Sequence, residues 1–243
     1  MAFVPEALWE DMQDAGLVHV AKDSFRLPSF DEALVAGSVL EHRFQDLASK
    51  WHQQGRLPAW RNEAFAICSA ASRLPKFSLE RVAARHLGFR TEAVHVNGLS
   101  ADGESMWLAR RSMAKDSDPG LLDNMVAGGL SAGEDIEQCL WRECWEEAGI
   151  AAGGEDAALF QNRLRPLKSL HIHCFEGFNG PWPHIRRERL FAFALHLPVG
   201  FVPVNQDGEV SEYKCVNRAE LRQLIEEGAL TKDAALVAGL WLR

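Results

Sequence analysis

Apolar side chains recur at helical spacing in two segments near the start of the chain. Residues 5–15 place them on one face, and residues 30–54 repeat them at intervals of three and four. This spacing predicts a short and a longer amphipathic helix. Ser29 stands where it would cap the longer helix, and Gly55 where it would end it. Residues 63–70 then suit a strand.

A last helix before residue 90 is predicted at 79–86, and from residue 91 strand-like runs dominate. Strands are predicted at 93–99, 106–110, 125–129, 170–175, 190–197 and 209–216. Helices are predicted at 136–148, 218–227 and 233–242. Since strands and helices mix without a regular βαβ alternation, the pattern favours an α+β fold with helices layered on a mixed sheet.

Turn residues mark two loops. Asp118, Pro119 and Gly120 predict a turn. Residues 178–187 are expected to form a longer loop, because the run from Gly180 to Pro183 contains two prolines and a glycine.

Composition and charge narrow the class of protein. A chain of 243 residues suits one domain with an extension, and we place the boundary between residues 1–90 and residues 91–243. The net charge of −8 and the lack of a long basic run argue against a nucleic-acid partner. The five cysteines have no metal or Cys-x-x-Cys spacing, which predicts free thiols and a cytoplasmic protein. No apolar run approaches the ~18 residues of a membrane span, so no membrane partner is expected.

Three glutamates on one helix face carry the candidate chemistry. Glu143, Glu146 and Glu147 stand at i, i+3 and i+4 of the helix predicted at 136–148. Carboxylates this close repel one another unless a cation lies among them, and Mg²⁺ or Mn²⁺ prefers such oxygen ligands. Arg142 is placed to orient Glu146. A solvated acidic helix face is the alternative interpretation.

The glycines before this helix make the pattern more specific. Gly128, Glu134, the Arg142-Glu143 pair, the Glu146-Glu147 pair and Gly149 follow one another at the spacing of the Nudix signature, and Gly129 is a supporting residue beside it. The chain therefore resembles the Nudix hydrolases. The resemblance implies an α/β/α sandwich around a mixed sheet, preceded here by a small, mostly helical N-terminal domain. It also implies metal-dependent attack of water on a diphosphate, with the three helix glutamates as metal ligands and Glu134 as a supporting carboxylate.

Two further carboxylates and a basic loop lie outside this motif. Glu209 is a candidate metal ligand or general base, and Glu212 is the second candidate; an exposed charge at the sheet edge is the alternative for both. Arg110, Arg111 and Lys115 form a dense basic stretch that suits diphosphate oxygens. A solvated loop is the alternative for these cations.

Three more residues are candidates for substrate binding. Trp107 adjoins the basic stretch and offers a ring for stacking. His95 and Asn97 occupy alternating positions of one predicted strand, so both side chains lie on one face and could meet a ligand. Structural roles in the core are the alternative for all three.

The substrate class follows from two resemblances. Isopentenyl-diphosphate isomerases share the basic stretch but use a catalytic cysteine where this chain has Ala127, and alanine cannot transfer a proton, so isomerase activity is not expected. The chain is more similar to the Nudix subfamily whose N-terminal domain is related to the Nudix part of thiamin pyrophosphokinase fusions. Resembling stretches are 60–63, 94–98, 107–112, 119–124, 201–203 and 207–210.

That subfamily implies a small-molecule substrate, an oxidised thiamin diphosphate analogue that is cleaved to the monophosphate. The alternatives are a nucleoside-diphosphate derivative, such as ADP-ribose or a dinucleotide, and a non-catalytic Nudix ligand sensor. The apolar faces of the predicted N-terminal helices would pack either on the Nudix core or on a second copy of the chain, in a homodimer.

Overall fold

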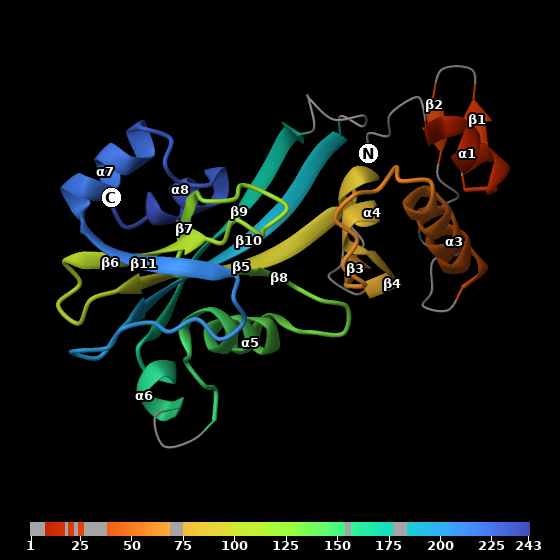
Figure 1. Cartoon of the computed structure of the whole chain (residues 1–243). Coiled ribbons are helices and arrows are strands. Elements are labelled where there is room, and N and C mark those ends of the chain that lie inside the picture. Colours follow the sequence, from red (N-terminus) through yellow and green to blue (C-terminus); the bar gives the residue numbers. More distant parts are fainter. Residues whose placement is uncertain are drawn as a thin grey trace. The chain divides into compact units, whose positions relative to one another are not determined.

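The computed structural model describes residues 8–17, 19–21, 24–26, 38–68, 75–153, 157–176 and 184–243. They fall into two compact units (Figure 1). Unit 1 comprises the described residues of Met1–Thr91, Leu130–Gly133 and His171–Arg189, and unit 2 comprises those of Glu92–Gly129, Glu134–Leu170 and Leu190–Arg243. The first stretch of unit 1 ends near the boundary expected at residue 90, and two later segments of the chain join it.

Unit 1 contains helices and two-stranded sheets. Its helices are α1 (Trp9–Asp14), α3 (Val39–Gln53) and α4 (Arg81–His86). Its hairpins pair β1 (His19–Ala21) with β2 (Ser24–Arg26) and β3 (Ala64–Cys68) with β4 (Pro75–Glu80), both antiparallel.

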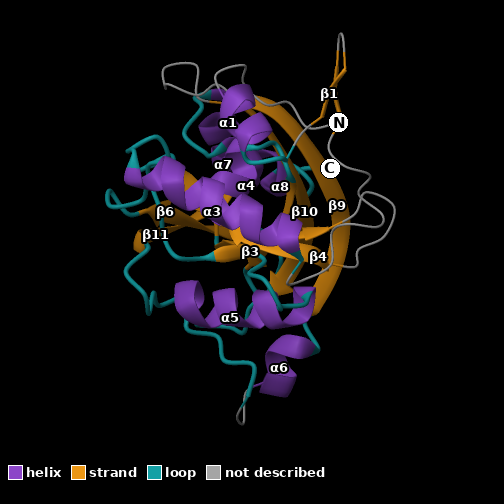
Figure 2. Ribbon diagram, turned by 90° about the vertical axis from the view of Figure 1, so that its right-hand side faces the viewer, coloured by secondary structure: helices purple, strands orange, loops and turns teal. Residues whose placement is uncertain are grey.

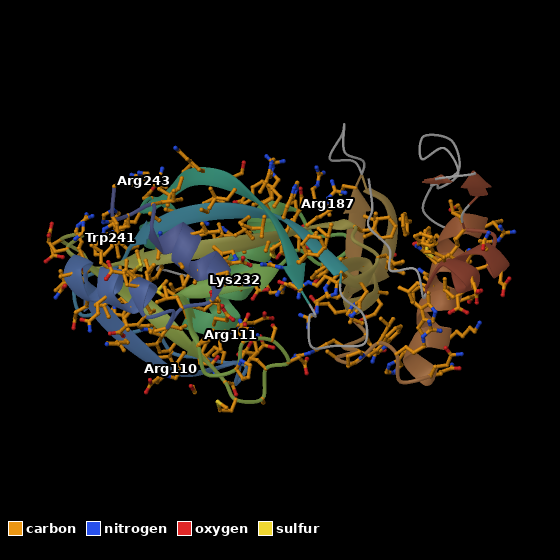
Figure 3. All side chains as sticks on the ribbon, turned by 90° about the horizontal axis from the view of Figure 1, so that it is seen from above. Arg110, Arg111, Arg187, Lys232, Trp241 and Arg243 are labelled. Atoms are coloured by element: carbon orange, nitrogen blue, oxygen red, sulfur yellow. The ribbon has the colours of Figure 1, made fainter. Side chains whose placement is uncertain are left out.

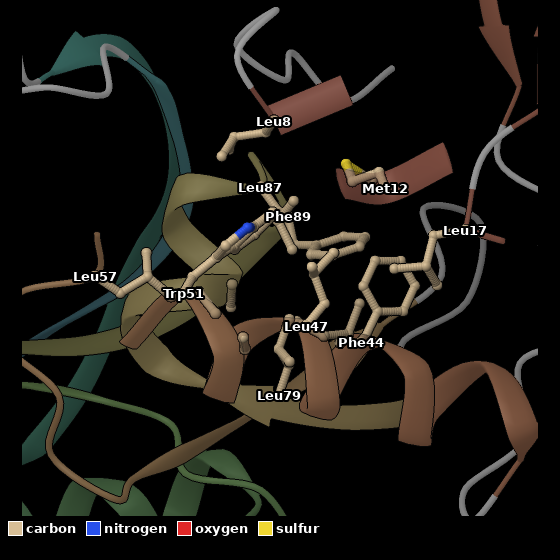
Figure 4. Packing of buried hydrophobic residues seen from close by; sticks show 14 of the residues in the cluster. Leu8, Met12, Leu17, Phe44, Leu47, Trp51, Leu57, Leu79, Leu87 and Phe89 are labelled. Atoms are coloured by element: carbon tan, nitrogen blue, oxygen red, sulfur yellow. The ribbon is translucent and has the colours of Figure 1, made fainter. Parts of the chain in front are cut away.

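The core of unit 1 forms around the apolar face of α3. Trp51 is fully buried, and Phe44 stacks on Phe77 with ring centroids 5.3 Å apart (Figure 4). Asp11 of α1 accepts hydrogen bonds from Trp51 Nε1 at 2.9 Å and Arg56 Nη1 at 2.6 Å. These contacts join α1 to the end of α3, and they lower the pKa of Asp11 to about 2.

The predicted helix over 30–54 is wrong at its start. Ser38 has an extended backbone, with φ −69° and ψ 158°, and its side chain accepts a hydrogen bond from Glu41 N, so α3 begins at Val39. Ser29 and residues 30–37 lie outside the described residues. The predicted end is confirmed, since Gly55 follows α3 with φ +70°.

A mixed sheet that lies mostly in unit 2 belongs to an α+β fold, as predicted. The strands of this sheet are β5 (Arg90–Leu99), β6 (Ser105–Arg111), β7 (Leu122–Asn124), β8 (Val126–Gly129), β9 (Leu164–Glu176), β10 (His184–His196) and β11 (Val210–Asn217). The end of β9, the start of β10 and the first two residues of β5 are counted with unit 1. The order is β11-β6-β5-β10-β9, while β7 pairs with β6 and β8 with β5. Strands β11, β6 and β5 are therefore neighbours in the sheet, and they carry the candidate residues Glu212, Trp107, Arg110, Arg111, His95 and Asn97.

Helices cover both faces of this sheet. They are α5 (Ile136–Ala148), α6 (Ala157–Gln161), α7 (Arg218–Glu226) and α8 (Lys232–Ala238). Figure 2 shows α5 on one face and α7 and α8 on the other. Met106 and Leu108 of β6 pack with Leu221 of α7 and Ala234 of α8. The resulting layers match the predicted α/β/α sandwich.

Several element boundaries differ from the predicted ones. Leu79 and Glu80 belong to β4 rather than to the helix after it, and 184–187 belong to β10 rather than to a loop. Strand β9 begins at Leu164, six residues before the predicted start. The prediction missed these residues because they are mostly exposed and carry no apolar alternation. All five cysteines are free thiols, as predicted. Among the described helices, none combines the length and apolar character needed to cross a bilayer.

Candidate active site

Helix α5 carries the motif glutamates, and its two ends are defined by the sequence. Asp135 caps its start with a capping box that includes Gln138, and Gly149, with φ +70°, ends it. Glu143 and Glu147 are buried, and Glu146 is half-buried.

Gly128 makes room for one of these carboxylates. A Cβ at Gly128 would lie 1.8 Å from Glu143 Cδ, so the carboxylate occupies the space that any other residue would need. Because β8 lies beside α5, the glycine lets a buried side chain pack directly on the strand backbone. The Gly128 in the motif is thus required by the position of Glu143.

The two buried carboxylates have strongly perturbed pKa values. Burial raises the pKa of Glu143 to about 7, with Arg142 acting in the opposite direction. Burial and then the neighbouring Glu143 raise the pKa of Glu147 well above its usual range. Glu147 Oε2 accepts a hydrogen bond from Ala127 N at 2.7 Å. Two carboxylates desolvated side by side gain from any cation placed between them.

Arg142 organises the carboxylates on one side of the cluster. Its Nε and Nη2 donate to the two oxygens of Glu134 at 2.6 and 2.9 Å. Its Nη1 donates to Glu143 at 2.7 Å and to Glu146 at 2.9 Å. The structure therefore places Arg142 against Glu146, as the motif spacing suggested. Glu134 meets the cluster through Arg142.

Lys115 brings a second cation to the cluster. Its Nζ pairs with Glu209, and its side chain is 14% exposed. The carbonyl of Glu209 accepts a hydrogen bond from Ser112 N at 2.8 Å, which ties the basic loop to the start of β11. Burial raises the pKa of Glu143, Glu147 and Asp207, and the positive charge of Lys115 lowers the pKa of each. Lys115 and Glu209 thus join the helix glutamates in one site.

The two arginines predicted for the basic loop lie instead at the end of strand β6, where Figure 3 labels both, and they bind other partners. Arg110 pairs with Glu212 and donates to Gly120 O at 2.8 Å. Glu212 is 57% exposed, so this pair lies at the surface. Arg111 donates to Asp123 Oδ2 at 2.9 Å. Of the three predicted cations, Lys115 is the one whose charge lowers the pKa of the buried Glu143 and Glu147.

His95 and Asn97 form a buried polar ladder. His95 Nδ1 bonds Asn124 Oδ1 at 2.8 Å, and Asn124 Nδ2 donates to Asn97 Oδ1 at 2.8 Å. Asn97 Nδ2 then donates to Val237 O of α8 at 3.0 Å. The ladder lies on the α8 face of the sheet, so the structure does not bring His95 or Asn97 to the glutamates of α5.

Trp107 is half-buried on β6, opposite Cys215 of β11. Within the described part of the chain, no hydrogen bond or ring contact joins Trp107 to the site carboxylates. A role of this ring in substrate binding stays a prediction.

Three residues outside the predicted set also interact with the site. The negative charge of Asp123 contributes to the raised pKa of Glu147. Asp207 Oδ1 accepts a hydrogen bond from Glu209 N at 2.8 Å. The hydroxyl of Tyr213 donates to Glu147 O, and burial raises the pKa of this phenol. Tyr213 is the single tyrosine of the chain, which is the one sequence signal that would have marked it.

These residues fit a divalent metal ion by their chemistry. Within the described ranges, no three His, Cys, Asp or Glu side chains already surround one ion position. Arg142 and Lys115 hold the carboxylates instead. The donors are nevertheless hard oxygens, and burial raises the pKa of Glu143 and Glu147, so a divalent cation would be bound in preference to two protons.

Comparisons with known proteins agree with the fold and the motif. The NUDIX domain family is matched over residues 89–236. Two Arabidopsis thaliana proteins, named Nudix hydrolase 24, chloroplastic, and Nudix hydrolase 20, chloroplastic, are 35% and 36% identical to this chain over 74% of its length. The matched parts are 47% and 46% of those proteins, so the chain spans about half the length of these relatives.

Among solved structures, DR0079 from Deinococcus radiodurans has the same fold. It aligns with a TM-score of 0.56 and 20% identity, over 74% of this chain and 100% of that one. The family match covers more than half of the chain and includes every motif residue of the site. The chain belongs to the NUDIX domain family.

Proposed function

We propose that this chain is a hydrolase that uses a divalent metal ion to cleave a small organic diphosphate. The observation that carries the proposal is the cluster itself. Arg142 pairs with Glu143 and Glu146, and Lys115 pairs with Glu209. Burial desolvates the carboxylates of Glu143 and Glu147. Structural acidic surfaces do not bury carboxylates in this way, because the cost is not offset.

Mg²⁺ or Mn²⁺ is the cofactor that the donor set favours. Glu143, Glu146, Glu147 and Glu209 would hold it, since all four supply oxygen ligands. When bound there, the ion supplies positive charge against the phosphate oxygens and makes water more acidic. The protein's net charge of −8 makes this contribution necessary for an anionic substrate.

The reaction requires one water and one proton acceptor. Water oxygen adds to a phosphorus atom of the diphosphate, the bridging P–O bond breaks, and the products are an organic monophosphate and inorganic phosphate. Glu209 is the proposed acceptor of the water proton. Its side chain is 32% exposed, so water reaches it more easily than it reaches the buried Glu143 and Glu147. Glu146 is similarly exposed, at 35%, but Arg142 holds its carboxylate.

The two cations have different tasks in this proposal. Arg142 donates to three carboxylates and holds them in place. Lys115 is a compact, flexible charge that can exchange a carboxylate oxygen for a phosphate oxygen. Arg110 and Arg111 are engaged with Glu212 and Asp123 and support the basic loop.

For the substrate, we propose an oxidised thiamin diphosphate analogue. The proposal depends on the sequence stretches that resemble the thiamin-related Nudix subfamily, including 60–63 and 119–124. ADP-ribose and dinucleotides are the competing substrates, because they contain the same diphosphate group. Enzymes that act on these different substrates share one fold, so the loops around the site determine which substrate is bound.

A turnover panel tests the proposal. Oxidised thiamin diphosphates, ADP-ribose, NADH and nucleoside triphosphates are incubated with the protein and Mg²⁺ or Mn²⁺, and phosphate and monophosphate are separated and quantified. The highest kcat/KM is expected for the oxidised thiamin diphosphates. Glu146→Gln is the inactive control. Glu137→Gln makes the same change at an exposed position of the same helix and is the matched control outside the site.

Two results would overturn parts of the proposal. A higher kcat/KM for ADP-ribose or NADH would replace the thiamin substrate and keep the chemistry. Saturable binding of a diphosphate, with turnover no greater than that of Glu146→Gln, would replace the enzyme with a ligand sensor.

A further inference from the structure

The last turn of α5 carries two of the motif glutamates, and its carbonyl groups are bound from outside the helix. The last four carbonyls of any α-helix have no donor within the helix. The first of them, Trp145 O, is bound by Gly149 N at 3.0 Å. The other three belong to Glu146, Glu147 and Ala148, and one segment, residues 204–213, binds all of them.

Each of these three carbonyls has its own donor. Gln206 N donates to Glu146 O at 2.7 Å, and Val204 N donates to Ala148 O at 3.2 Å. The carbonyl between them, Glu147 O, accepts from the hydroxyl of Tyr213. Tyr213 is thus the side chain among these donors, and removing its hydroxyl leaves the other two hydrogen bonds in place.

The segment fits closely against the end of the helix. A Cβ at Gly149 would lie 3.1 Å from Val204 O and 3.2 Å from Gln206 Nε2. Gln206 Nε2 also donates to Val204 O at 2.9 Å, which stiffens this part of the segment. A rigid contact of this kind transmits the position of β11 to the last turn of α5.

The same segment carries Glu209. Its backbone is fixed on both sides, because Glu209 N donates to Asp207 Oδ1 at 2.8 Å and Glu209 O accepts from Ser112 N at 2.8 Å. Four residues later, Tyr213 lies opposite Ala109 of β6 in the sheet. One short stretch of chain therefore presents Glu209 and binds Glu147.

We propose that Tyr213 is a positioning residue for the metal-binding carboxylates. Its hydroxyl fixes the last turn of α5 against β11 and so sets the spacing between Glu147 and Glu209. This role rests on the proposed function only in that these carboxylates bind a divalent metal ion. Tyr213 itself touches neither the metal nor the substrate.

Direct metal binding tests this role without any substrate. Free Mn²⁺ is measured by electron paramagnetic resonance during titration of the wild type, Tyr213→Phe and Ser211→Ala. Ser211 is also a β11 residue, but its hydroxyl donates to the carbonyl of Arg110 on β6 rather than to a carbonyl of α5. We expect Tyr213→Phe to bind Mn²⁺ roughly tenfold more weakly and Ser211→Ala to bind it like the wild type. The Mg²⁺ concentration for half-maximal turnover should rise by the same factor, with KM for the diphosphate unchanged.

A second measurement keeps the Tyr213 hydroxyl in place and observes this residue directly by ¹⁹F nuclear magnetic resonance. Because the chain has one tyrosine, growth on 3-fluorotyrosine labels position 213 alone. The ¹⁹F resonance should shift when Mg²⁺ is added to the labelled wild type and should stay in place in labelled Glu146→Gln.

The outcomes separate this inference from the proposed function. If Tyr213→Phe and the wild type bind Mn²⁺ with equal affinity, or if the ¹⁹F resonance does not shift when Mg²⁺ is added, the role of Tyr213 is overturned and the proposed function is unaffected. A wild type that binds no Mn²⁺ overturns both the inference and the metal site. Mn²⁺ binding that weakens as expected, in a protein that hydrolyses no diphosphate, supports the inference and overturns the proposed function.

Discussion

Gly128 matters because it has no side chain. The space that its Cβ would fill holds the carboxylate of Glu143, so a methyl group there must displace a buried, charged side chain or shift β8. Overpacking of this kind costs about 1–3 kcal/mol.

We expect Gly128→Ala to lose about 2 kcal/mol of unfolding free energy and most of its Mn²⁺ binding, since Glu143 is pushed out of place. Urea denaturation and Mn²⁺ titration measure the two effects. Gly153→Ala is the control, because nothing lies within 4 Å of a Cβ at that position. A Gly128→Ala protein with wild-type Mn²⁺ affinity would show that Glu143 is not a ligand.

Lys115 pairs with Glu209, and we propose that it also binds the substrate diphosphate. We expect Lys115→Ala to raise KM for the diphosphate roughly tenfold, because one charge-assisted contact is worth about 1.5–3 kcal/mol. Steady-state kinetics at saturating Mg²⁺ measure this change. Lys168→Ala, at an exposed position of β9, serves as the control. An unchanged KM in Lys115→Ala would remove Lys115 from substrate binding.

At the scale of elements, helix ends with local signals could be predicted and others could not. The bounds of α5 match the prediction because Asp135 and Gly149 act within a few residues of it. The start of α3 does not, because the apolar repeat continues upstream of Ser38 while the backbone at Ser38 is extended. A periodic pattern records which residues could share a helix face, and capping decides where the helix begins.

The position of this cap is testable. We expect Ser38→Ala to lower the unfolding free energy by about 1 kcal/mol, because Glu41 N loses its acceptor. Urea denaturation followed by circular dichroism measures the change. Val39→Ala, at a position that is 70% exposed, should have a much smaller effect. If Ser38→Ala is equally mild, the cap at Ser38 contributes nothing to stability.

For the whole molecule, pH should act on stability through unit 1. Burial lowers the pKa of His86 from 6.5 to about 4, with nearby His184 and Arg85 acting in the same direction and Glu176 and the Val82 carbonyl in the opposite one. His86 stacks on His184 with ring centroids 4.4 Å apart. Between these two pKa values the unfolded chain binds more protons than the folded one, so stability falls as pH falls through this window.

We expect a loss on the order of 2 kcal/mol from His86 between pH 6.5 and pH 4. Urea denaturation at several pH values measures it. In His86→Asn, which cannot take up a proton, the pH dependence over this window should be smaller by that amount. An identical pH dependence in the variant and the wild type would exclude His86 as the cause.

The sequence by itself determined the motif helix, its ends, the shared face of Glu143, Glu146 and Glu147, and the mixed α+β class. These features depend on residues within a few positions of one another, so spacing and local hydrogen bonding specify them.

Tertiary structure decided which distant residues meet. It paired Lys115 with Glu209 and set the Lys115 charge against the raised pKa values of Glu143 and Glu147. It also turned the ladder of His95 and Asn97 toward α8 and bound Tyr213 to the last turn of α5. Which face of a strand meets which layer depends on register and on packing between segments far apart in the chain, and no local pattern records those.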